Sequence, residues 1–104
     1  MKKQIVADVV AFKQTLKEKM PDLQVRYGIK SLGIFGSYVH GEQKKRSDVD
    51  LLVEFDEHAA VTLLRFVALE RELGKLLGQR VDLVEKSALK PVIGQRILSE
   101  VVAV

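Results

Sequence analysis

One segment, the eight residues DVDLLVEF at positions 48–55, constrains the fold of this chain more than any other. Its apolar side chains recur at every second position, which is the period of a β-strand with one buried face. They are Val49, Leu51, Val53 and Phe55. The same alternation places Asp48 and Asp50 together on the opposite face. A solvated strand end is the simple explanation of this pair, but acids are depleted in strands, so two together indicate a function.

Helical and strand periods alternate along the rest of the chain. The predicted helices are residues 4–20, 60–77 and a last helix capped by Ser87, and the predicted strands are residues 32–35, 48–55 and 80–84. Pro21 should end the first helix and Gly78 should cap the second. The predicted core residues of the second helix are Leu63, Phe66, Val67, Leu73 and Leu77. The final VVAV fits either an edge strand or a fraying helix end. The alternation predicts an α/β fold in which helices cover one small sheet.

Length and composition exclude several classes of protein. A chain of 104 residues can bury one core, so we predict a single domain over 1–104. The absence of cysteine excludes disulfides and thiolate metal sites, and it favours the cytoplasm. Asp8 and Lys13 interrupt the N-terminal apolar stretch before it resembles a signal peptide, and no run approaches the ~20 residues of a membrane span. A net charge of +3 and scattered aromatic residues do not favour a nucleic-acid interface.

The acids at positions 48 and 50 have the spacing of a cation site. Residues two apart on a strand share a face and lie roughly 6.5–7 Å apart, so the carboxylates of Asp48 and Asp50 can converge on one ion. Mg²⁺ suits them because it takes hard oxygen ligands and completes its shell with water and substrate phosphates. Asp82, on the next predicted strand, is a candidate third acid. It is either a ligand of a second ion or the acceptor of a proton, and an Asp that merely faces solvent is the alternative.

A glycine-serine pair, Gly36-Ser37, ends the strand that precedes these acids. A glycine there lets the backbone approach a phosphate closely, and the serine hydroxyl with neighbouring amides can bind phosphate oxygens. Ten residues separate Ser37 from Asp48. This spacing allows the chain to leave the phosphate-binding turn, cross a short helix and a basic loop, and return on the strand that carries the acids.

The segment GIFGSYVHGEQKKRSDVDLLVEF resembles the minimal nucleotidyltransferases of the polymerase-β-like superfamily. The resemblance implies that superfamily's fold, with a small mixed sheet covered by helices. It also implies Mg²⁺-dependent transfer of AMP from ATP to a tyrosine of a HEPN-type ribonuclease toxin, which makes the chain an antitoxin. Gly36 and Ser37 would hold triphosphate, Asp48 and Asp50 would bind Mg²⁺, and Asp82 would match the third acid. This chain has His40 where many relatives have arginine.

Other residues and functions remain open at this point. Arg46 lies two residues from Asp48 and is a candidate nucleotide contact, whereas a solvated loop is favoured for the neighbouring Lys44 and Lys45. Packing is favoured over nucleotide stacking for Tyr38. The alternative functions are a non-catalytic antitoxin that acts by binding, and nucleotidyl transfer to a small molecule or RNA.

Overall fold

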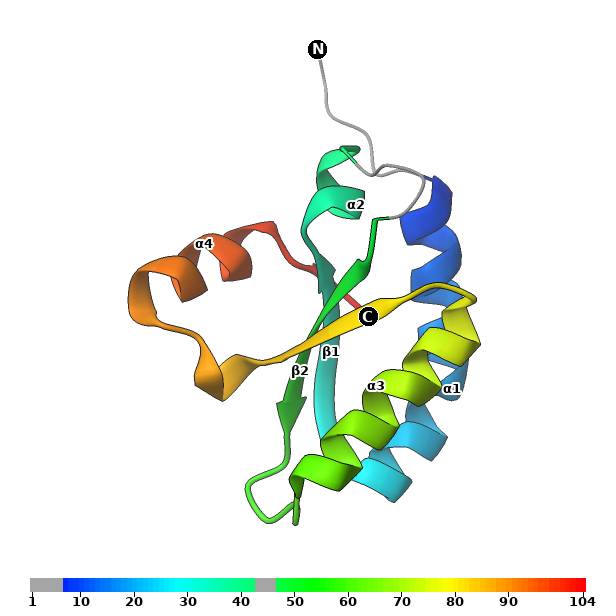
Figure 1. Cartoon of the computed structure of the whole chain (residues 1–104), viewed down its shortest axis with the longest axis vertical. Coiled ribbons are helices and arrows are strands. Elements are labelled where there is room, and N and C mark those ends of the chain that lie inside the picture. The colour runs from blue at the N-terminus through cyan, green and yellow to red at the C-terminus, as the bar shows by residue number, and fades with distance from the viewer. Residues whose placement is uncertain (1–6, 43–46) are drawn as a thin grey trace.

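The structure is a computed structural model that describes residues 7–42 and 47–104 (Figure 1). Its helices are α1 (Ala7–Tyr27), α2 (Ser37–His40), α3 (Leu63–Leu77), the 3-10 turn η1 (Lys86–Ala88) and α4 (Pro91–Glu100). Its strands are β1 (Ile29–Phe35), β2 (Val49–Phe55), β3 (Val81–Glu85) and β4 (Val102–Ala103). No helix in this described part of the chain is long and apolar enough to cross a membrane.

The strands form a mixed sheet in the order β3-β2-β1-β4. β1 pairs antiparallel with β2 and β4, whereas β2 and β3 are parallel and are joined by α3. A parallel pair needs such a crossover, because a tight turn cannot join two strands that run in the same direction. Figure 1 shows α1 and α3 on one side of the sheet and α4 on the other. The predicted α/β fold with a small mixed sheet is therefore confirmed.

The core lies between the sheet and the layer formed by α1 and α3. Val49, Leu51 and Val53 of β2 are fully buried there, as the alternation in the sequence predicts. Leu16 of α1 and Leu73 of α3 face them from the helical layer, also fully buried. Each such side chain contributes about 1.5–3 kcal/mol to folding, so β2 is held firmly by one face. The other face of the strand carries Asp50 and Glu54 on either side of Leu52, which is also buried.

The predicted end of the first helix at Pro21 is wrong, because α1 continues through it to Tyr27. A proline removes one helical hydrogen bond and crowds the preceding turn, so contacts beyond it must offset that cost. Leu23 is almost fully buried, Arg26 forms an ion pair with Glu72 of α3, and the Tyr27 hydroxyl donates to Glu72 at 2.9 Å. Tertiary contacts of the last turn thus override the local signal.

The core residues of α3 and the start of α4 also differ in part from the prediction. Of the predicted core residues of α3, Leu73 is fully buried and Phe66 and Leu77 pack against the core partly buried, whereas Leu63 and Val67 are exposed. Leu69, which is fully buried, was not among them. The last helix is not capped by Ser87, because Ser87 lies in η1 and Pro91 occupies the start of α4. Proline suits that position, where a backbone N–H has no helical partner. Gly78 caps α3 in the left-handed conformation, as predicted, and the final residues form the edge strand β4.

Candidate active site

Three acids gather at one edge of the sheet, on the face opposite α1 and α3. Asp50 is paired in register with Asp82 across the parallel strands β2 and β3. Side chains at paired positions of neighbouring strands project to the same face, with the strands about 4.8 Å apart. Asp48 lies two residues before Asp50, just ahead of β2. The structure thus brings together the three acids that the sequence analysis singled out.

The charges of these acids act on one another. Partial burial, followed by the nearby charges of Asp82 and Asp48, raises the pKa of Asp50 from 3.8 to about 6. An acid with an opposite charge beside it would show the reverse effect. The cluster is therefore a concentration of negative charge at a partly desolvated position, which a cation would neutralise.

The turn after β1 places backbone directly against this cluster. Phe35, the last residue of β1, is paired with Asp50, and Gly36 follows with φ 81° and ψ −152°, a conformation that favours glycine. A Cβ added to Gly36 would lie 2.0 Å from Oδ2 of Asp50. Gly36 is thus required by both its conformation and the space available. It brings the start of α2, including Ser37, to the edge of the acidic cluster.

Tyr38 supports this turn from the core side. Its side chain is 4% exposed, and its ring meets Phe12 of α1 edge-on with centroids 5.4 Å apart. Its hydroxyl lies 3.5 Å from the carbonyl oxygen of Ser47, in the segment that leads to Asp48. Packing, rather than nucleotide stacking, is therefore the role of Tyr38. It connects α1, α2 and the entry to β2 around the candidate site.

Two residues at the site were missed by the sequence analysis. Arg80 precedes β3, and its Nε lies 3.8 Å from Oδ1 of Asp48. Glu70 of α3 accepts a hydrogen bond from the backbone N–H of Leu83 at 2.8 Å, next to Asp82 on the outer strand. Glu70 therefore helps to hold β3 in place. Arg80 has a signal in the sequence, since it stands two residues before Asp82 as Arg46 does before Asp48.

The structure places the remaining candidates as follows. Arg46 lies outside the described residues. His40, at the end of α2, approaches Oε2 of Glu100 in α4 with its Nε2 at 2.9 Å. The His40 side chain is thereby engaged with α4 and partly buried.

The donor set of the three acids fits Mg²⁺. Within residues 7–42 and 47–104, no group of three or more acids and histidines forms a ready metal cage. Mg²⁺ does not require one, because one or two carboxylates, water and substrate phosphates complete its shell. Asp48 and Asp50 supply hard oxygen ligands on one face. The pKa of Asp50 is raised first by burial and then by the charges of Asp82 and Asp48, and a divalent cation would stabilise its charged form. These residues, with Asp82, are the ones that would hold the ion.

Comparison with known proteins identifies the family. Residues 9–104 match the nucleotidyltransferase domain family, and this match spans nearly the whole chain. The chain belongs to the nucleotidyltransferases. The predicted resemblance to minimal nucleotidyltransferases is likewise confirmed. The prediction that the chain is an enzyme, a nucleotidyltransferase, is confirmed as well.

Individual relatives of this nucleotidyltransferase are close over most of their length. Protein adenylyltransferase MntA of Thermococcus cleftensis is 53% identical over 83 residues, which are 80% of this chain and 82% of that protein. A solved structure of a candidate minimal nucleotidyltransferase is 37% identical with a TM-score of 0.70, over 86% of this chain and 89% of that chain. A complex of a tri-AMPylated Shewanella oneidensis HEPN toxin with MNT antitoxin matches at 20% identity and a TM-score of 0.60, over 88% of this chain and 70% of that chain. At that identity the last match shows the fold alone, which is the polymerase-β-like fold predicted above.

Proposed function

We propose that this nucleotidyltransferase transfers AMP from ATP to a tyrosine of a HEPN-type toxin, with Mg²⁺, and thereby acts as an antitoxin in the cytoplasm. The observation that carries the proposal is the convergence of Asp48, Asp50 and Asp82 at the edge where Gly36 brings the backbone against Asp50. The adenylyltransferase name of the Thermococcus relative supports transfer of AMP to protein. The tri-AMPylated HEPN toxin in the Shewanella complex supports the class of acceptor.

The chemistry is a substitution at phosphorus. The tyrosine hydroxyl oxygen forms a bond to the α-phosphorus of ATP, the bond from that phosphorus to the bridging oxygen breaks, and diphosphate leaves. The phenolic proton passes to a carboxylate of the cluster or to water. Bound Mg²⁺ would supply charge neutralisation and orientation of the phosphates. Gly36 and Ser37 position the triphosphate, and Asp48 and Asp50 hold the reacting end in place. Asp82, held by β3, completes the acidic cluster.

The acceptor is a protein in this proposal because the chain offers the nucleotide half of the reaction. Among the described residues, Gly36, Ser37 and the three acids account for nucleotide and cation binding. A partner that presents its own hydroxyl at the sheet edge that carries the acids would complete the site. Holding both reactants in such a geometry replaces a bimolecular encounter with an oriented one.

The test uses the purified chain, ATP, Mg²⁺ and the toxin encoded beside its gene. We expect a mass gain of one or more AMP groups on a toxin tyrosine, and its loss when Asp48 is replaced by asparagine. The variant Asp56→Asn, at the far end of β2, is the matched control and should retain activity. If Asp48→Asn protein still neutralises the toxin in cells, neutralisation is by binding. If AMP appears on total RNA or a small molecule and not on the toxin, the acceptor class is wrong.

A further inference from the structure

Arg80 is a cation at the acidic cluster for which the proposed mechanism has no role. Its side chain is 89% exposed, and its Nε lies 3.8 Å from Oδ1 of Asp48, whose side chain is 42% exposed. Within the part of the chain that the structure describes, this is the one ion pair formed by Asp48, Asp50 or Asp82. A site of three acids that receives a polyanionic nucleotide needs positive charge, and Arg80 is placed to provide it.

The backbone fixes where Arg80 stands. Its carbonyl oxygen accepts a hydrogen bond from the N–H of Val49 at 2.8 Å, so its Cα lies beside the start of β2. Val49 and Val81 are paired, which puts Arg80 level with Asp48 at the same edge of the sheet. Gly36 lies at this edge on the other side of β2. Two inter-strand spacings separate the two positions, or about 10 Å. A triphosphate with one end at Gly36 therefore extends within reach of the Arg80 side chain.

The ion pair with Asp48 does not prevent such a contact. Exposed pairs of this kind stabilise a protein by about 0–1 kcal/mol, so the guanidinium is readily released. Arginine presents a planar array of donors that matches two phosphate oxygens at once, and charge-assisted bonds of that kind are among the stronger ones in proteins. Phosphate oxygens carry more charge than a carboxylate that is shared with a cation. The Arg80 guanidinium would leave the Asp48 carboxylate and bind the phosphates of the substrate by a side-chain movement alone.

We propose that Arg80 binds the diphosphate portion of the nucleoside triphosphate and makes the site select triphosphate over monophosphate. The inference rests on the proposed function, because it assumes that a triphosphate occupies the turn at Gly36. It adds a specificity-determining residue, located by the pairing of β3 with β2. The same guanidinium would stabilise the charge that gathers on diphosphate as it leaves.

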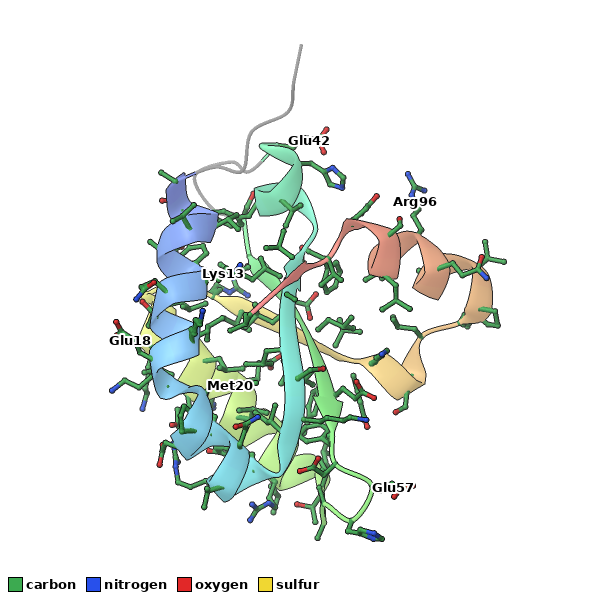
Figure 2. The ribbon with its side chains drawn as sticks, turned by 180° about the vertical axis from the view of Figure 1, so that it is seen from behind. Lys13, Glu18, Met20, Glu42, Glu57 and Arg96 are labelled. Carbon is green, nitrogen blue, oxygen red and sulfur yellow. The ribbon has the colours of Figure 1, made fainter. Side chains whose placement is uncertain are left out.

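The experiment measures nucleotide binding and not turnover. Wild type and the Arg80→Gln variant are titrated by calorimetry, in Mg²⁺, with AMP and with an ATP analogue whose α,β-bridging oxygen is a methylene group. Arg96→Gln is the matched control. Arg96 is 85% exposed and lies 3.9 Å from Glu100, so its surroundings resemble those of Arg80. Figure 2 shows Arg96 on α4, pointing away from the sheet.

We expect Arg80→Gln to weaken binding of the ATP analogue by roughly 5- to 20-fold, and to change AMP binding by about twofold or less. Arg80→Lys should fall between wild type and Arg80→Gln, since lysine keeps the charge and loses the two-point contact. Equal losses for AMP and the analogue, or an equal loss in Arg96→Gln, would overturn the inference. Unchanged analogue binding in Arg80→Gln would overturn this inference and leave the proposed function standing. Absence of analogue binding in wild type would overturn it together with the proposed function.

Discussion

Asp50 should lower the stability of the fold at neutral pH, although the site needs it. Its pKa is raised from 3.8 to about 6, mainly by burial and further by the charges of Asp82 and Asp48. The folded protein therefore binds this proton more tightly than the unfolded chain does. The resulting stabilisation is complete below about pH 4 and is lost as the pH rises through about 6. Above that range the ionised carboxylate remains in an unfavourable environment.

The magnitude follows from the same values. The difference between 3.8 and about 6 corresponds to roughly 3 kcal/mol when each pKa unit is worth about 1.36 kcal/mol. Asp50 is only partly buried, so solvent screening reduces this to roughly 1–2 kcal/mol. We expect Asp50→Asn to raise the free energy of unfolding by that amount at pH 8, and by roughly a third of it at pH 4.5, where the unfolded carboxyl is already largely ionised. Nucleotidyl transfer should be abolished.

Urea denaturation in the presence of a chelator measures this effect. Asp56→Asn, an exposed position at the far end of β2, controls for the substitution itself. Figure 2 shows the neighbouring Glu57 at the end of the molecule remote from Glu42, which follows α2. Added Mg²⁺ at ten times its dissociation constant should stabilise the wild type by about 1.4 kcal/mol and Asp50→Asn by less. A variant no more stable than wild type at pH 8 would refute the argument from desolvation.

Two further predictions concern the backbone. Gly36→Ala should lower the free energy of unfolding, measured by urea denaturation, by roughly 3 kcal/mol or more and abolish binding of the ATP analogue, because the new Cβ would meet Asp50 at 2.0 Å at a positive φ. Gly78→Ala is the control: its φ is 66° and no atom lies within 4 Å of the new Cβ, so it should lower the free energy of unfolding by only about 1 kcal/mol. Similar costs for both would show that the Asp50 contact relaxes. Pro21→Ala should raise the free energy of unfolding by about 1–3 kcal/mol, because Pro21 is exposed and inside α1. A destabilised Pro21→Ala variant would mean that the ring makes contacts that offset its helical cost.

Local patterns in the sequence predicted the strand that carries the site. Alternation over residues 48–55 is a property of neighbouring positions, and it placed Asp48 and Asp50 on the face opposite Val49 and Leu51 before any fold was known. Gly36 was predicted to let the backbone approach a phosphate, and this stays a prediction; the close contact that the structure shows there is with the Asp50 carboxylate. The alternation depends on few residues that are close in sequence, and the strand was therefore predicted well.

Features that depend on contacts between distant segments were not predictable in this way. The register that pairs Asp50 with Asp82 is set by the length and packing of α3, so the sequence alone left Asp82 open to a solvent-exposed interpretation. α1 passes Pro21 because Arg26 and Tyr27 find Glu72, 45 or 46 positions later. Glu70 reaches Leu83 in the same manner across an element boundary. Local propensity is overridden wherever such tertiary contacts exist.

The two faces of β2 have opposite effects on the stability of the molecule, and this links the site to the core. Asp50, with its raised pKa, sits between Leu51 and Val49, which are fully buried on the other face of the same strand. Burial of those side chains offsets the cost of gathering acids at the sheet edge. Because side-chain direction alternates with period two, a shift of β2 by one residue would bury Asp48 and Asp50 and expose Val49. The core therefore fixes the direction of Asp50 and Asp82 through the register of the paired strands, and it carries Asp48 and Gly36 in the segments that directly adjoin those strands.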